Sequence, residues 1–171
     1  MRIENEIKLD FKDVLIRPKR STLNSRKDVY LEREWNFKNG KRFAGIPIIV
    51  ANMDTVGTMK MARALKPHHM CVALHKFYEP KELYDFFRHP DSYLSFYTLG
   101  TSDADLDKFR SIYKELETKP SPYPISDIIL GKVGENHYLN KVCIDVANGY
   151  SEHFNSFIKK ATFPEWSSWW C

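Results

Sequence analysis

Four short apolar runs recur along the chain and predict its strands. They are rich in β-branched residues and nearly continuous in apolar character: IPIIVAN (46–52), CVALHK (71–76), LSFYTLG (94–100) and KVCIDVAN (141–148). Continuous rather than alternating apolar character is typical of parallel strands that are covered on both faces. The pattern therefore predicts a parallel sheet of four strands.

A helical pattern follows each run. Thr58 precedes a segment that groups Met61, Ala62 and Leu65, and Pro80 suits the first turn of the next helix. Ser102 or Asp103 can cap a third helix. Ser151 precedes a fourth segment, which places Phe154, Phe157 and Ile158 together. The chain thus repeats a β-α unit four times, which favours an α/β fold.

The spacing of these units indicates a barrel. The runs start at 46, 71, 94 and 141, so two spacings are about 24 residues and one is 47. A unit of this length suits a (β/α)₈ TIM barrel, which needs ~250 residues. We therefore expect a (β/α)₈ barrel truncated to about the first four β/α units, with an N-terminal extension. The expected divisions are 1–45 for the extension, 46–160 for the half barrel with an insertion at 119–140 on the surface, and 161–171 for a divergent tail.

Polar residues gather where the predicted strands end. The reactive groups of parallel β/α sheets lie beyond the carboxyl ends of the strands. The pattern favours a ring of polar groups there over a set of helix caps and turn residues; its members are Asn52, Asp54, His75, Lys76, Thr98, Thr101, Asp145 and Asn148. Gly149 is expected to let the chain reverse into the last helix.

Lys76 is the sharpest candidate among these residues. An ammonium at a strand end could donate a proton or hold an anion, and a solvated loop lysine is the alternative. His75 could be a general acid or a packed imidazole. The extension has a hairpin signal at Asn39-Gly40 and a basic arm, 17–27, which could bind phosphate or be simply solvated.

Composition and charge narrow the class of protein. The 171 residues are 43% hydrophobic and 28% charged, with a net charge of +4. These values are typical of a globular protein. The sequence shows no apolar run long enough to span a membrane and no apolar leader at its start. The basic arm lacks the interleaved aromatic residues that are typical of a nucleic-acid-binding surface. The cysteines at 71, 143 and 171 form no metal or disulfide spacing. We expect a cytoplasmic protein with no metal, no membrane partner and no nucleic-acid partner.

Several long motifs, in order, resemble one enzyme family. The stretches LDFKDVLIRPKRSTLNSRKDV, GIPIIVANMDTVGT, HK, GTSDAD and CIDVANGYSEHF are similar to GMP reductase, in its N-terminal part only. IMP dehydrogenase shares the barrel but carries an inserted domain after the second strand, and the short 76–94 interval leaves no room for one.

The resemblance implies an activity and a set of site residues. Members of the family form homotetramers of (β/α)₈ barrels that use NADPH to convert GMP to IMP and ammonia. By resemblance, Ser25 and Arg26 reach NADPH, and the strand-end residues Asp145, Val146 and Ala147 line the cofactor site. Lys76 lies at the junction of cofactor and substrate, where it helps to protonate the departing ammonia.

The sequence also departs from the family. None of Cys71, Cys143 and Cys171 matches the family's nucleophilic cysteine, so the chain is expected to be inactive as a GMP reductase. The alternative function is a non-catalytic relative that binds the cofactor weakly or associates with full-length subunits. The ending FPEWSSWWC predicts a frameshift, altered splicing or a damaged gene.

Overall fold

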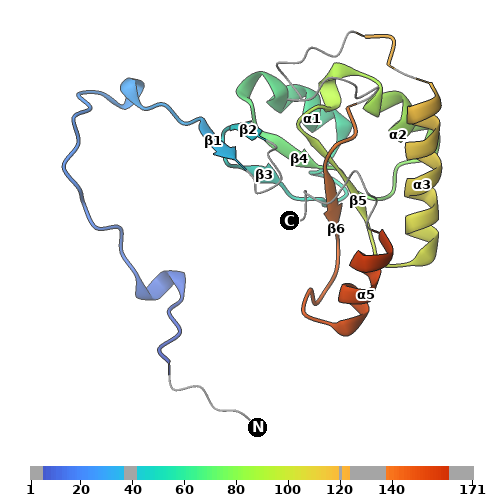
Figure 1. Cartoon of the computed structure of the whole chain (residues 1–171). Coiled ribbons are helices and arrows are strands. Elements are labelled where there is room, and N and C mark those ends of the chain that lie inside the picture. The colour runs from blue at the N-terminus through green and yellow to red at the C-terminus, as the bar shows by residue number, and fades with distance from the viewer. Residues whose placement is uncertain (1–5, 37–41, 120, 124–137, 162–171) are drawn as a thin grey trace. The chain divides into compact units, whose positions relative to one another are not determined.

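The structure is a computed structural model that describes residues 6–36, 42–119, 121–123 and 138–161 (Figure 1). It divides into two compact units, 1–30 and 31–171. The first unit shows its side chains to solvent at every described position. The second unit holds the sheet, the long helices and the core.

A parallel sheet of four strands is the centre of the second unit. Its strands are β3 (Ile49–Val50), β4 (Cys71–Ala73), β5 (Ser95–Leu99) and β6 (Val142–Ile144), and they lie in the order β3-β4-β5-β6. In register, Val50 pairs with Val72, Ala73 with Phe96, and Thr98 with Cys143. The predicted strands and their parallel arrangement are confirmed.

Each strand is followed by the helix that the sequence predicts. The helices are α1 (Met59–Leu65), α2 (Pro80–Phe87), α3 (Asp103–Thr118) and α5 (Glu152–Ala161). The hydroxyls of Thr58, Ser102 and Ser151 accept backbone N–H groups of Met61, Asp105 and Phe154, which satisfies donors that have no partner inside a helix. Pro80 occupies the first turn of α2. The choice between Ser102 and Asp103 is thereby settled for Ser102.

The strands carry two apolar faces because successive side chains of a strand point to opposite sides. Val72, Leu74 and Tyr97 join the large cluster under α2 and α3, two helices that run side by side in Figure 1. Cys71, Ala73 and Phe96 form a smaller cluster on the other face, against Phe43 and Cys143. Both faces of β4 are therefore covered, as the continuous apolar run predicts.

The extension contributes a pair of antiparallel strands to the second unit. These are β1 (Arg33–Asn36) and β2 (Arg42–Gly45), with the rings of Trp35 and Phe43 5.6 Å apart between centroids. The pairing agrees with a hairpin, while the predicted turn at Asn39-Gly40 lies outside the described residues. The expected boundary at 45 stays a prediction.

The predicted insertion, 119–140, is described only at its two ends. Tyr138 and Leu139 are each 1% exposed, and the Tyr138 N–H donates to the carbonyl of Phe87 at 3.0 Å. A surface path is therefore wrong for the returning end of this segment, because both side chains are buried and Leu139 belongs to the large apolar cluster. The rest of the insertion, at 120 and 124–137, and the tail from 162 onward lie outside the described residues.

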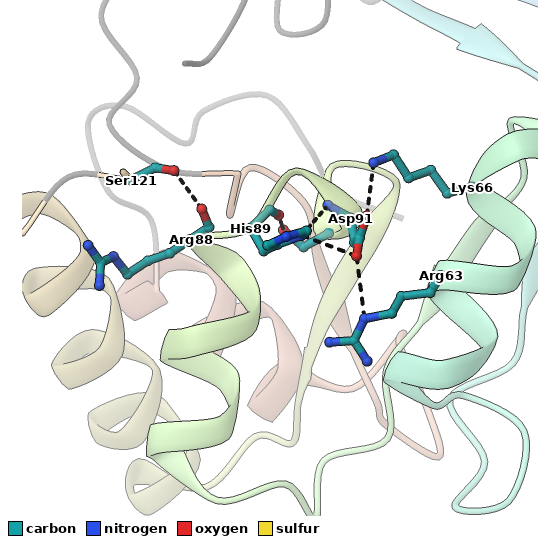
Figure 2. Close-up of polar contacts among 7 residues, drawn as sticks. Arg63, Lys66, Arg88, His89, Asp91 and Ser121 are labelled. Carbon is teal, nitrogen blue, oxygen red and sulfur yellow. Dashed lines mark hydrogen bonds and ion pairs between the residues drawn. The ribbon is translucent and has the colours of Figure 1, made fainter. Parts of the chain in front are cut away.

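A charged cluster joins α1 to the turn before β5, at the edge of the sheet opposite the carboxyl ends of the strands. In the 3-10 helix η4 (Pro90–Ser92), Asp91 accepts from Lys66 Nζ at 2.9 Å and lies 3.4 Å from Arg63 Nε (Figure 2). Burial raises the pKa of Asp91, but the hydrogen bond and charge of Lys66, with His89 and Arg63, outweigh it and hold that pKa below its ordinary value. The cluster therefore fixes α1 against the third β/α unit.

Among the described residues, none of the helices is long and apolar enough to cross a bilayer.

Candidate functional site

The carboxyl end of β4 is built into a tight contact with the turn that follows β3. The N–H of His75 donates to the carbonyl of Gly57 at 2.8 Å. A Cβ at Gly57 would lie 2.7 Å from the carbonyl oxygen of Ala51, and closer still to that of Ala73. Only glycine fits this approach, which brings the 53–57 turn against the end of β4.

His75 is held in one orientation by its neighbours. The imidazole is 9% exposed and stacks on the Tyr78 ring with centroids 4.0 Å apart. Its Nδ1 accepts the N–H of Phe77 at 3.3 Å, so the neutral ring carries its proton on Nε2. Nε2 lies 3.9 Å from a carboxylate oxygen of Asp54, whose side chain is 72% exposed. This distance is too long for a hydrogen bond, so Asp54 lies near the imidazole without engaging it.

Lys76 comes directly after His75 in the chain, in the loop that follows β4. Its side chain is open to solvent, and Nζ lies 5.9 Å from the centroid of the Phe77 ring, which is itself 65% exposed. An ammonium beside an exposed aromatic face suits an anionic ligand that also carries a flat ring. His75 is thus packed whereas Lys76 is accessible, which separates the two candidates.

The ends of β5 and β6 lie next along the sheet. Thr98 is 5% exposed, and its hydroxyl has no hydrogen-bond partner among the described residues. The N–H of Asp145 donates to the carbonyl of Leu99 at 2.8 Å, while the Asp145 side chain is exposed. Val146 is half-buried and Ala147 is exposed. The predicted polar ring is therefore uneven, with Asp54 near His75 and an open carboxylate at β6.

The turn after β6 runs through Asn148 and Gly149. The side-chain oxygen of Asn148 accepts the N–H of Tyr150 at 2.9 Å, which is the turn role expected of an asparagine. Gly149 has no positive φ, and a Cβ there would meet only the Phe154 ring at 3.8 Å. Gly149 lies in this turn, where the chain reverses toward α5, and the space around it would also accept a Cβ.

The predicted arm residues lie in the first unit. Ser25 caps the short 3-10 helix η2 (Arg26–Asp28): its hydroxyl accepts the N–H of Lys27 at 3.2 Å, and its own N–H donates to Asp28 at 2.9 Å. Arg26 is exposed. The basic arm thus has local order around Ser25 and presents the Arg26 guanidinium to solvent.

The described cysteines are packed among apolar residues, and the described metal-ligating residue types do not gather into a site. Cys71 is 2% exposed in the small apolar cluster, and Cys143 packs against that cluster. Both positions suit small hydrophobic residues. Cys171 lies outside the described residues. In the part of the chain that is described, no group of three or more His, Cys, Asp or Glu residues could hold a metal ion.

Comparison with known proteins shows which enzymes the chain is similar to. The chain is 48% identical over 165 residues to the GMP reductases of Klebsiella pneumoniae and Escherichia coli, which is 94% of this chain and 42% of each relative. The chain is therefore similar to the GMP reductases. It fits their N-terminal part and spans less than half of their length. No family model matches the chain.

A solved structure supports the fold of this chain. Inosine 5′-monophosphate dehydrogenase from Legionella pneumophila matches with a TM-score of 0.60 and 22% identity, over 88% of this chain and 39% of that one. At this identity the likeness shows the fold alone, which is the α/β architecture of the TIM-barrel family.

Three residues of the site escaped the sequence patterns. Gly57 lies in a turn with no unusual spacing, and Tyr78 and Lys108 act across the fold. The Tyr78 hydroxyl accepts the N–H of Met59 at 3.0 Å, and Lys108 Nζ donates to the carbonyl of Tyr78 at 2.5 Å. These partners are 19 and 30 residues apart, so no local pattern joins them.

Proposed function

We propose that this chain supplies the cofactor side of a GMP reductase-like site, for the NADPH-dependent reductive deamination of GMP to IMP and ammonia. The observation that carries the proposal is the 48% identity over 94% of the chain, with an exposed lysine at the buried end of β4. The likeness favours an oxidoreductase of purine nucleotide metabolism. The proposal includes a cytoplasmic location and a homotetramer as the assembly of the complete barrel.

Residues from three parts of the chain would hold NADPH. Lys76 offers an accessible ammonium, which suits a phosphate or a developing negative charge. Asp145 offers exposed carboxylate oxygens to ribose or amide donors, with Val146 and Ala147 beside it as small apolar contacts. By the family likeness, Ser25 and Arg26 would contact NADPH bound to a neighbouring subunit. The donor set fits an anionic dinucleotide because it combines cations with hydrogen-bond acceptors.

The chemistry can be divided between the cofactor and these residues. Bound NADPH would supply a hydride. Lys76 would hold or deliver a proton at the position of the departing ammonia. His75 would orient the loop rather than react, because Phe77 and Tyr78 already engage its ring. No cysteine of the chain matches the family nucleophile, so we propose cofactor binding without turnover.

The four β/α units would correspond to the first half of a (β/α)₈ barrel. In support, all four strands are parallel and adjacent in chain order, and the helices α2 and α3 cover one face. The ends that carry Lys76 and Asp145 lie at the same edge of this sheet, as the reactive groups of such barrels do.

Titration with NADPH tests the proposal. We expect saturable binding by the chain and binding at least about fivefold weaker for Lys76→Met, because a charged hydrogen bond is lost. Lys114→Met, an exposed change on α3, is the matched control and should bind like the parent. Binding that is absent, or that is the same in Lys76→Met, would overturn the proposal.

An assay with GMP and NADPH separates the two forms of the function. Binding without steady NADPH loss supports a non-catalytic relative that retains the cofactor side. Steady GMP-dependent NADPH loss would contradict the proposed absence of turnover and favour the complete reductase activity.

A further inference from the structure

The loop that carries Lys76 is held from a helix that belongs to the next β/α unit. Lys108 lies on α3, and its Nζ donates to the carbonyl of Tyr78 at 2.5 Å and reaches the carbonyl of Lys76 at 3.5 Å. We propose that Lys108 is a positioning residue, which fixes the backbone of the 76–78 loop and so aims the Lys76 ammonium at an anionic cofactor. This inference rests on the proposed function.

The helix that carries Lys108 is a firm support. Ser102 caps α3, and the helix buries Leu106 and Phe109 at 1% and 3% exposure, on either side of Lys108 in sequence. The two buried residues fix the rotation of α3 against the core. Lys108 is half-buried, and its two hydrogen bonds hold the ammonium near the loop carbonyls.

Tyr78 anchors the other side of the same loop. Its ring stacks on His75, and its hydroxyl accepts the N–H of Met59 at the start of α1. The loop therefore contacts α1 through the hydroxyl, the end of β4 through the ring, and α3 through the carbonyl. Such a loop loses little conformational entropy when a ligand binds, because its backbone is already ordered.

The two lysines thus have different tasks. The Lys108 ammonium is directed to two backbone carbonyls, whereas the Lys76 ammonium extends from the same loop into solvent. Removal of Lys108 would leave the Tyr78 carbonyl without this donor and allow the loop to sample other conformations. The effect on an anionic ligand would then pass through Lys76.

A double-mutant cycle tests this coupling, with NADPH as the probe. Lys108→Met should weaken NADPH binding about fivefold in the parent chain and by less than about twofold in the Lys76→Met background. Lys108→Arg should restore most of the affinity, since a guanidinium can donate to both carbonyls. Lys114→Met is the control on the same helix, and a thermal melt confirms that each variant is folded.

The possible outcomes separate the positioning role of Lys108 from the proposed cofactor binding by Lys76. If Lys76→Met leaves binding unchanged, the proposed function fails. If Lys76→Met weakens binding but Lys108→Met does not, only the positioning role fails. Lys108→Met could instead weaken binding equally in both backgrounds, with the loss disappearing in about 0.5 M salt, where charges are screened. That result would show that Lys108 attracts the cofactor by its own charge, and it would also overturn the positioning role.

Discussion

The carboxyl ends of β4 and β6 carry the two main groups of candidate residues in opposite surroundings. At β4, His75 is 9% exposed, donates its N–H to Gly57 and stacks on Tyr78. At β6, Asp145 is exposed, and Tyr150 in the turn beyond it is 98% exposed. Both ends follow a short apolar strand, so the strand alone does not decide how its end is arranged.

The difference follows from the neighbours of each strand. β4 lies between β3 and β5. The turn after β3 accepts the His75 N–H at Gly57, and Lys108 of α3 donates to the carbonyl of Tyr78 in the loop after β4. β6 pairs with β5 on one side within the described residues, and the turn after it is built mainly by Asn148. A site residue at β4 is therefore arranged by tertiary contacts, whereas one at β6 depends on its own turn. The predictions below test this difference, from the largest expected effect to the smallest.

Alanine at two glycines should give the widest contrast. Gly57→Ala places a Cβ against the carbonyls of Ala51 and Ala73, and should lower the free energy of unfolding by about 3 kcal/mol. Gly149→Ala should change it by less than about 0.5 kcal/mol, because the new methyl meets only the Phe154 ring at ordinary contact distance. Urea unfolding of both variants measures the contrast. Equal losses at the two positions would remove the proposed difference between the strand ends.

Loss of one hydroxyl should show the same contrast on a smaller scale. Tyr78→Phe removes the acceptor of the Met59 N–H at the start of α1, and should lower the free energy of unfolding by about 1.5 kcal/mol. Tyr150→Phe, at the exposed β6 end, is the matched control and should be neutral. Chemical denaturation followed by circular dichroism provides the comparison; a neutral Tyr78→Phe would mean that the hydroxyl does not support the helix.

The charged cluster at the opposite end of the strands should depend on pH. Folding lowers the pKa of Asp91 below its ordinary value of 3.8, so its contacts with Lys66 stabilise the fold above that value and are lost as pH falls through the lower folded pKa. Asp91→Asn should therefore cost about 1 kcal/mol at pH 7, a figure reduced for partial exposure, and almost nothing near pH 2. Unfolding curves at the two pH values test this. A loss of the same size at both would assign the effect to packing rather than charge.

The smallest effect on stability should come from the exposed carboxylate at β6. Asp145→Asn should leave the free energy of unfolding within about 0.5 kcal/mol of the parent, because the side chain is exposed. It should nevertheless weaken NADPH binding several-fold if Asp145 accepts hydrogen bonds from the cofactor. A stability loss without an affinity loss would reverse the assignment and make Asp145 a structural residue.

Local chemistry explains which parts of the fold the sequence predicts. The four strands follow from continuous apolar runs, and the caps by Thr58 and Ser102 follow from hydroxyls placed just before helical patterns. Each of these depends on residues within a few positions of one another. The turn after β6 is equally local, since Asn148 accepts the N–H of Tyr150 and Gly149 lies between them.

Long-range contacts explain most of what the sequence could not predict. Lys108 and Tyr78 are ordinary residues of a helix and a loop until the sheet brings α3 beside the end of β4. The burial of Tyr138 likewise depends on α2, far earlier in the chain. At the site, His75 and Lys76 were recognisable as candidates, but only the structure separates the packed imidazole from the accessible ammonium.

The central claim is that one anionic cofactor binds across the ends of β4 and β6. Backbone amide chemical shifts of the isotope-labelled chain, followed by NMR during an NADPH titration, test it most directly. The account predicts saturable shifts at residues 75–78 and 145–147 with one common dissociation constant. Shifts confined to the basic arm, or no saturable shifts at either strand end, would contradict it.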